Sequence, residues 1–301
     1  MPPLALRYWP VWFGLGMLWL SAQLPYRLQM FLGRGLGRLM RQTFKSRVRI
    51  ARRNLELCFP QWDDERRERL LRENFLSIGC MVFEVAFAWW ASNRRFLTRV
   101  HFQGTRHLTE ARKQGNGLVI LAAHFTTLEV GGFAATHVAG DNVAGFYREH
   151  TNQAMEWLVH RVRERYVGRI FNRLELRAAV RHLRGGGLLW YAPDQDYRRG
   201  DNRFVPFFGV QASTSTSPHQ LARMGKARVL LMSQRRLPDN SGYVVSFQPA
   251  FENMPSASPE QDLHRINQAL ETVIRECPEQ YLWIHRRFKT RPEGEESVYK
   301  M

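Results

Sequence analysis

The stretch GLVILAAHFTTLEVGG, residues 117–132, decides the fold and points to the chemistry. Its first half is a short aliphatic run bounded by glycine, which indicates a buried strand, and its second half is typical of a helix. His124 stands at the end of the strand, and Glu129 follows five positions later. On one continuous helix this spacing would turn the two side chains apart. They can converge if a helix capped by Thr126 or Thr127 begins between them.

A histidine and a carboxylate placed together can activate a hydroxyl group. The imidazole takes the proton near neutral pH, and a carboxylate on its other ring nitrogen fixes the tautomer. The sequence has no GxSxG motif and no cysteine near His124, so the expected nucleophile is the hydroxyl of the substrate. These features predict acyl transfer without a covalent acyl-enzyme. The pair alone is weak evidence, and no metal is expected because HExxH and HxH spacings are absent.

Strands and helices alternate after residue 100. Further strands are expected at LLWYA, ARVLLMSQ and YVVSFQ, and helices at LEVGGFAATHV, AMEWLVHRVRERY, LELRAAVRHLR, SPHQLARMG and DLHRINQALETVIREC. This alternation predicts an α/β domain whose mixed sheet is covered by helices. The expected organisation is an anchor helix over 1–26, a basic and apolar helical region over 27–100, and a single catalytic domain over 101–301. A helix over 63–90 falls in the middle region.

The N-terminal part is apolar and then strongly basic. Residues 8–25 carry no charge and are rich in tryptophan, which favours an uncleaved membrane anchor over a cleaved signal peptide. Whether this anchor crosses the membrane or lies in its interface stays open. Residues 27–53 hold nine basic residues and no acidic one, and the whole chain has a net charge of +17. This pattern favours anionic membrane lipids as a partner. Nucleic acid is not expected, because no nucleic-acid-binding motif is present. Three cysteines without a CxxC pair are typical of a reducing compartment.

Several motifs occur together in a recognisable order. They are AAHFTTLEVGG, GFYR, LLWYAPDQDY, FVPFFG, LARMGKA and PEQYLWIHRRFKTRPEG. Together they resemble the late lipid A biosynthesis acyltransferases, with more similarity to the lauroyltransferase branch than to the myristoyltransferase branch. The resemblance implies transfer of a fatty acyl chain from acyl carrier protein to the 3-hydroxyl of an acyl chain on a lipid A precursor. It also implies a bacterial inner-membrane location with the catalytic domain on the cytoplasmic face.

The resemblance also assigns roles to particular residues. It implies that His124 is the general base, that Glu129 orients it, and that Asp194 is a third essential position. Arg163 matches a family arginine only approximately, with Arg161 and Arg165 as close alternatives.

The acceptor implied by the resemblance carries phosphate groups, which arginine binds well. Arg148, Arg163 and Arg173 lie between the two strands expected at the site and are candidate substrate-binding residues. The basic stretch 285–291 is expected at a surface that faces the membrane or the carrier protein. No cofactor is expected, since 4'-phosphopantetheine belongs to the acyl donor.

Two alternatives stay open. A glycerolipid or lysophospholipid acyltransferase would use a similar pair, but H-x4-D and a PEGTRS-like block would then be expected instead of Glu129 and APDQD. A non-catalytic protein of the membrane surface would turn over no acyl donor.

Overall fold

The computed structural model describes residues 2–114, 117–140, 142–147, 150–163, 168–172, 175–196 and 200–300. The helices are η1 (Leu6–Tyr8), α1 (Trp9–Gln23), α2 (Tyr26–Thr43), α3 (Lys45–Cys58), α4 (Asp64–Trp90), α5 (Asn93–Leu97), α6 (Thr105–Gln114), α7 (Leu128–Ala139), α8 (Gln153–Arg163), α9 (Leu176–Arg184), α10 (Ser217–Gly225), α11 (Pro259–Glu276) and η2 (Pro278–Gln280). The strands are β1 (Val100–Gln103), β2 (Leu118–Leu121), β3 (Val143–Tyr147), β4 (Arg169–Asn172), β5 (Leu188–Tyr191), β6 (Asn202–Phe207), β7 (Val210–Ser215), β8 (Arg228–Arg236) and β9 (Tyr243–Phe247).

A seven-stranded mixed sheet forms the centre of the molecule. Its strand order is β1-β9-β8-β2-β5-β3-β4, and all neighbours pair in parallel except β8 and β9. The expected mixed α/β sheet is therefore confirmed. Strands β2 and β5 lie side by side in the middle of the sheet, and their carboxyl ends point to the same edge. Ligands of open α/β sheets usually bind at this edge.

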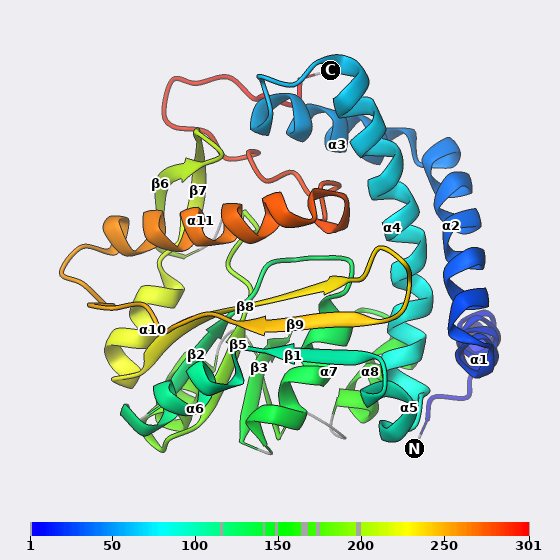
Figure 1. Ribbon diagram of the computed structural model, residues 1–301, viewed down its shortest axis with the longest axis horizontal. Helices are drawn as coiled ribbons and strands as arrows, with labels where there is room; N and C mark the ends of the chain where they lie inside the picture. The colour runs from blue at the N-terminus through cyan, green and yellow to red at the C-terminus, as the bar shows by residue number, and fades with distance from the viewer. Residues whose placement is uncertain are drawn as a thin grey trace.

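Helices cover both faces of the sheet, as Figure 1 shows with α11 above the strands and α7 below them. Along β2, Val119 and Leu121 join a cluster that contains α9, α10 and α11, whereas Leu118 and Ile120 join a cluster with α6, α7 and α8. Side chains of a strand alternate between its faces, so a strand buried on both faces reads as a continuous aliphatic run. The aliphatic run of β2 reflects this burial.

Helix α4 connects the N-terminal helices to the sheet. Asp63 caps it by accepting a hydrogen bond from the Arg66 backbone, as its sequence predicts. Its first half joins the hydrophobic cluster that contains α9, α10 and α11, and its second half joins the cluster with α6, α7 and α8. The packing of the second half explains why it is apolar on nearly every face. Helix α2 lies so close to it that a Cβ on Gly79 would come within 2.6 Å of the Gly37 Cα. Only glycine permits this approach of the two backbones.

The predicted N-terminal anchor contains α1, which has 15 residues and ends at Gln23. A sharp turn then leads into α2, and the two helices lie along one side of the molecule (Figure 1). In the part of the chain that the structure describes, no helix combines the length and the apolar character needed to cross a membrane.

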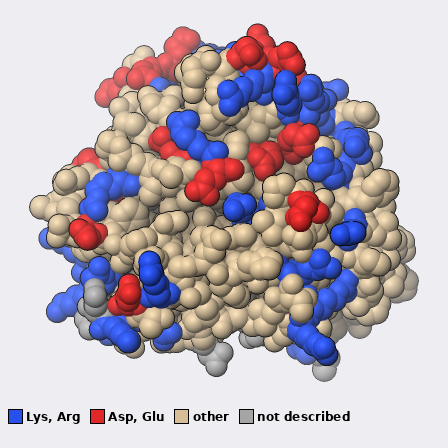
Figure 2. Space-filling model, viewed as in Figure 1, with Lys and Arg blue, Asp and Glu red and all other residues tan. Residues whose placement is uncertain are grey.

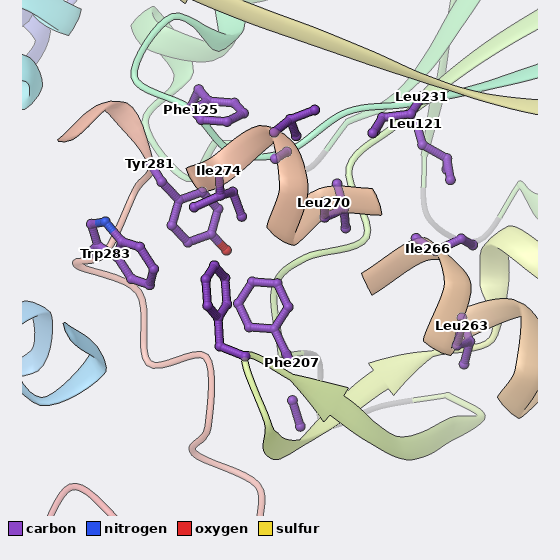
Figure 3. Close-up of a cluster of buried hydrophobic side chains, with 14 of the residues drawn as sticks. Leu121, Phe125, Phe207, Leu231, Leu263, Ile266, Leu270, Ile274, Tyr281 and Trp283 are labelled. Atoms are coloured by element: carbon purple, nitrogen blue, oxygen red, sulfur yellow. The ribbon is translucent and has the colours of Figure 1, made fainter. Parts of the chain in front are cut away.

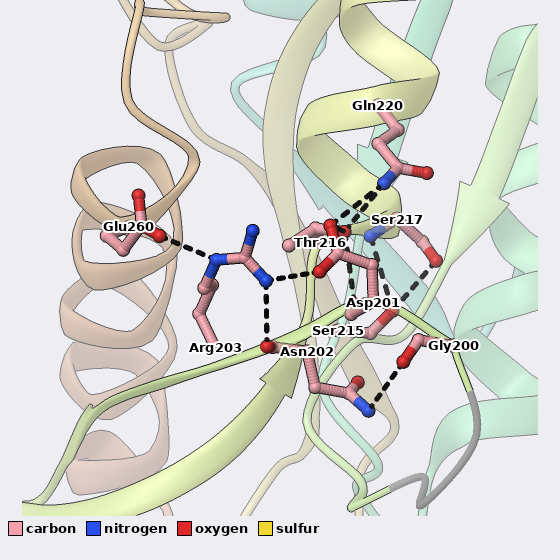
Figure 4. Close-up of polar contacts among 9 residues, drawn as sticks. All are labelled: Gly200, Asp201, Asn202, Arg203, Ser215, Thr216, Ser217, Gln220 and Glu260. Atoms are coloured by element: carbon pink, nitrogen blue, oxygen red, sulfur yellow. Dashed lines mark hydrogen bonds and ion pairs between the residues drawn. The ribbon is translucent and has the colours of Figure 1, made fainter.

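A two-stranded hairpin, β6 with β7, lies outside the main sheet. Figure 4 shows how it is attached: Arg203 of β6 donates to Glu260 of α11 at 2.6 Å and also pairs with Asp201. Asp201 in turn accepts a hydrogen bond from Thr216, at the start of α10. These contacts hold the hairpin against two helices, so that its Phe207 reaches the core beside the C-terminal segment (Figure 3).

Candidate active site

His124 lies where the chain leaves β2. The hydrogen-bond ladder with the neighbouring strand continues past the end of β2, since the Ala122 backbone donates to the Tyr191 carbonyl at 3.0 Å. The chain then turns into α7 at Thr127, which stands at the N-cap position. The Thr127 hydroxyl does not cap the helix but donates to the Gln234 carbonyl at 3.2 Å. The predicted placement of His124, between a buried strand and a helix, is therefore confirmed.

Asp194 is the carboxylate that meets this histidine. Leu118 pairs with Leu188 and Leu121 with Tyr191, so the same register carried three residues further places His124 opposite Asp194. The two share two hydrogen bonds: imidazole Nδ1 lies 2.6 Å from Oδ1, and the His124 backbone donates to Oδ2 at 2.9 Å. The carboxylate therefore holds both the ring and the main chain of the histidine.

Burial and charge act in opposite directions on this pair. Burial lowers the pKa of His124, but the charge and hydrogen bond of Asp194 outweigh it, so that this pKa is raised. Burial alone would raise the pKa of Asp194, yet the charge of His124 and the hydrogen bonds to the carboxylate lower it to about 2. Asp194 is thus a carboxylate at neutral pH and favours a hydrogen on Nδ1 of His124. Nε2 is then the ring nitrogen that can accept a proton.

The prediction that Glu129 orients His124 is wrong for this structure. Glu129 pairs with Arg163 of α8 and accepts a hydrogen bond from the Trp89 indole at 3.2 Å. The reason is its position on the second residue of α7, from which the side chain reaches toward α8 and α4. His124 makes its side-chain hydrogen bond with Asp194 instead.

The three predicted arginines have different outcomes. Arg163 lies beside Glu129, and its guanidinium is 4.9 Å from the centre of the Tyr147 ring. Arg148 and Arg173 lie outside the described residues. The structure therefore brings Arg163 and Glu129 together and places Asp194 at the histidine. Among the described residues, no group of three or more His, Cys, Asp or Glu side chains is arranged to hold a metal ion.

A pocket opens on the α7 face of the sheet. It is narrow, with about 40 Å³ open to the centres of water-sized molecules, and Glu129 and Arg163 are among its lining residues. The remaining lining is mainly apolar and comes from β2, β3, β4, β5 and α7: Ile120, Gly132, Ala135, Val143, Ala144, Gly145, Phe146, Tyr147, Ile170 and Trp190. Ile120 belongs to β2 and Glu129 to α7, so the pocket is lined by the two elements that precede and follow His124.

Sequence reasoning did not find the residues that hold the loop between β2 and α7. Ser77 of α4 lies 2.8 Å from the Thr126 hydroxyl and also accepts a hydrogen bond from Arg236. The Gln234 amide donates to the Ala123 carbonyl at 3.3 Å. These residues carry no signal in the sequence, because serine and glutamine are common in helices and strands. Their role depends on which elements the fold brings together.

One arginine of the C-terminal basic stretch differs from the prediction of a surface feature. Arg287 is only 3% exposed, and it donates to the Ser213 carbonyl at 2.6 Å and to the Thr214 hydroxyl at 2.8 Å. A buried arginine needs such hydrogen bonds, because its charge cannot be removed by losing a proton. At this position the basic stretch is therefore part of the core.

The comparisons with known proteins agree on one family. Residues 3–290 match the bacterial lipid A biosynthesis acyltransferase family. The chain is 42% identical to the lipid A biosynthesis palmitoleoyltransferase of Escherichia coli (strain K12), covering 97% of this chain and 95% of the relative. It is 38% identical to the lauroyltransferase of that organism with the same coverage, and 26% identical to its myristoyltransferase, covering 98% and 91%.

One solved structure with a low overall similarity was also found. It is the 1-acyl-sn-glycerophosphate acyltransferase from Thermotoga maritima, with a TM-score of 0.39 and 13% identity, covering 84% of this chain and 98% of that one. The extent and level of the sequence matches decide the assignment. The chain belongs to the bacterial lipid A biosynthesis acyltransferase family, and it is an acyltransferase.

Proposed function

We propose that the protein transfers a fatty acyl group from acyl carrier protein to the 3-hydroxyl of an acyl chain on a lipid A precursor. The observation that carries the proposal is the hydrogen-bonded His124–Asp194 pair at the carboxyl edge of the sheet, in a chain of this family. Such a pair is suited to removing a proton from an alcohol. The acyl donor brings its own 4'-phosphopantetheine thioester, and the protein uses no cofactor.

In the proposed mechanism, Nε2 of His124 takes the proton from the acceptor hydroxyl. The resulting oxygen nucleophile forms a bond to the thioester carbonyl carbon, and the carbon–sulfur bond then breaks. The thiolate leaves and takes the proton back from Nε2. During these steps the imidazolium is stabilised by Asp194, whose carboxylate accepts the hydrogen bond from Nδ1. No covalent acyl-enzyme forms.

The apolar pocket beside the site suits a fatty acyl chain. Its walls are mainly aliphatic and aromatic, and burial of each methylene contributes about 0.8 kcal/mol. We assign Glu129 and Arg163 to the polar part of this pocket, where their ion pair joins α7 to α8. Loss of either side chain should therefore affect substrate binding more than proton transfer.

The N-terminal helices support a location at a membrane surface. The exposed large hydrophobic side chains of the described residues all lie between residues 4 and 44, apart from Phe204 and Met224. Examples are Trp9 and Phe13 on α1 and Phe31 on α2. An exposed apolar surface of this extent is typical of a protein that contacts lipid. We therefore place α1 and α2 against the cytoplasmic face of the bacterial inner membrane.

Basic side chains beside this face support two anionic partners. The first acidic residue of the chain is Glu56, whereas Lys and Arg occur throughout α2 and α3. Figure 2 shows Lys and Arg side chains gathered over α3 near the top of the molecule, with Asp and Glu side chains next to them. Each such charge near an anionic membrane contributes about 1 kcal/mol to binding. The same charge favours encounter with an acidic donor such as acyl carrier protein.

Mass spectrometry of lipid A tests this function. A bacterial host that lacks its late acyltransferases should regain one acyl chain when it expresses the protein, and fragmentation should place that chain on a primary acyl group. The His124→Ala variant should be present in the membrane fraction and add nothing. Unchanged lipid A with the wild-type protein, together with acylation of a lysophospholipid in vitro, would favour a glycerolipid acyltransferase.

A further inference from the structure

Arg236 is a charged residue that is buried close to the catalytic loop, the segment 122–127 between β2 and α7. It is the last residue of β8 and is only 7% exposed. Its guanidinium Nε donates to Oε1 of Glu84 at 3.0 Å, and Glu84 is itself buried on α4. The ion pair therefore joins the end of β8 to α4 in the interior of the protein.

The first connection from Arg236 to the catalytic loop runs through side chains. Nη2 of Arg236 donates to the Ser77 hydroxyl at 2.8 Å, and this hydroxyl lies 2.8 Å from that of Thr126. Because the Ser77 oxygen accepts a hydrogen from Arg236, its own hydrogen can be donated to Thr126. Ser77 and Thr126 are both buried, and Thr126 follows His124 by two residues. A continuous chain of hydrogen bonds thus leads from the guanidinium to the loop.

The second connection runs through Gln280 of η2. Its side-chain amide accepts a hydrogen bond from the Arg236 backbone at 2.7 Å and donates to the Arg236 carbonyl at 3.1 Å. The Gln280 carbonyl in turn accepts a hydrogen bond from the Thr126 backbone at 2.7 Å. The side chain and the main chain of Thr126 are therefore tied to Arg236 by separate routes.

We propose that Arg236 is a positioning residue of the reaction, which holds the catalytic loop so that Nε2 of His124 points at the acceptor. Stability alone does not explain a buried ion pair here, because apolar residues of similar volume often stabilise a fold as well or better. Arg236 acts on His124 through Ser77 and Thr126. This inference rests on the proposed function of the His124–Asp194 pair.

The shape of the guanidinium is what makes this bridge. Its nitrogens form a rigid planar fork, so that Nε can face Glu84 while Nη2 faces Ser77. A lysine at this position keeps the positive charge beside Glu84, but its ammonium group is a single point on a flexible stem. Arg236→Lys therefore keeps the buried charges paired and loosens the connection to the loop.

Kinetics of the Arg236→Lys variant test the proposal. We expect kcat to fall about 10- to 100-fold, as when a remote change displaces a catalytic group. KM for the acyl donor and for the lipid acceptor should change less than about twofold, because the binding surfaces are kept. A variant that raises KM and keeps the wild-type kcat would contradict the positioning role.

Two buried threonines provide a matched comparison. Thr126→Val removes the hydroxyl that meets Ser77, and kcat should fall about 10-fold. Thr136 on α7 is also buried, but its hydroxyl donates to the Phe133 carbonyl of its own helix at 2.8 Å, so Thr136→Val should leave kcat unchanged. Arg236→Lys and Thr126→Val break the same bridge, so the double variant should lose little more than Arg236→Lys alone.

A second buried pair controls for a general loss of stability. Nδ1 of His219 lies 2.7 Å from Oδ2 of Asp262, and this pair joins α10 to the first turn of α11. Asp262→Asn should lower the melting temperature, as Arg236→Lys does, and leave kcat unchanged. Arg236 would be purely structural if both variants lost the same kcat below their melting temperatures. Independent losses from Arg236→Lys and Thr126→Val would also overturn the proposal.

Hydrogen exchange without substrate separates failure of this inference from failure of the proposed function. The Thr126 amide hydrogen is bonded to Gln280, so it should exchange slowly in the wild type and in Asp262→Asn. In Arg236→Lys it should exchange about 10-fold faster, because the loop opens more often. If this acceleration is seen but even the wild type does not acylate lipid A, the positioning role stands and the assigned reaction is wrong. Unchanged exchange at Thr126 overturns the positioning role.

Discussion

Replacement of Asp194 by asparagine separates the two carboxylates that could orient His124. The change is nearly isosteric, and the Asn side-chain oxygen can still accept the hydrogen bond from the His124 backbone. What is lost is the negative charge 2.6 Å from Nδ1. Because Asp194 is what raises the pKa of His124 against the effect of burial, this pKa should fall in the variant.

The size of the effect follows from the geometry. Charge centres of a directly bonded imidazolium and carboxylate lie about 4 Å apart, which corresponds to about 4 kcal/mol at an effective dielectric constant of about 20. The His124 side chain is 20% exposed and the Asp194 side chain 0%, so solvent screens their interaction only weakly. The imidazolium forms only as the proton is transferred, so the loss falls on the transition state. Asp194→Asn should therefore lower kcat by roughly 10³-fold.

The assay compares Asp194→Asn with Glu129→Gln in detergent micelles, with acyl carrier protein thioester and a lipid A precursor across roughly pH 5 to 9. Wild-type activity should rise with pH through the raised pKa of His124, because only the unprotonated imidazole is a base. The residual activity of Asp194→Asn should show this rise at lower pH. Glu129→Gln should keep the wild-type acid limb and raise KM. The opposite pattern, with the limb displaced only in Glu129→Gln, would refute the assignment of Asp194.

Three further outcomes are expected. Gly79→Ala should destabilise the protein by about 1–3 kcal/mol, because the new Cβ meets the Gly37 backbone. Gly35→Ala should not cause this loss, because there is open space around Gly35. Thermal unfolding in detergent compares the two variants. Phe31→Ser should weaken flotation with phosphatidylglycerol vesicles by about 10-fold, because roughly 1.5 kcal/mol of apolar burial is lost. Phe204→Ser on the β6 hairpin should leave flotation unchanged. Equal losses in the two variants would contradict the assigned membrane face. Arg163→Met should raise KM for the acyl substrates with the acid limb unchanged, because Arg163 pairs with Glu129 and not with His124; a displaced limb would contradict this role.

The sequence predicted the strand that ends at His124, the following helix and the class of the fold, because burial on both faces leaves a clear aliphatic run. The sequence could not decide whether Glu129 or Asp194 bonds His124, because local spacing does not give the pairing of distant strands. One signal was available: His124 and Asp194 each follow a buried strand by three residues. If β2 and β5 are neighbours in register, the two must face each other. The pairing of residues 280–282 with the loop at His124 has no such pattern, because it depends on how the end of the chain folds back.

Residues 280–282 pair with the loop that contains His124: the Thr126 backbone donates to the Gln280 carbonyl, and the Leu282 backbone donates to the His124 carbonyl. This pairing has a consequence for the synthesis of the protein. A nascent chain that has released β2, α7 and β5 from the ribosome already contains His124 and Asp194, but the loop between β2 and α7 still lacks these backbone partners. We therefore expect unfinished chains to be inert. Acyl transfer would begin only when translation is nearly complete.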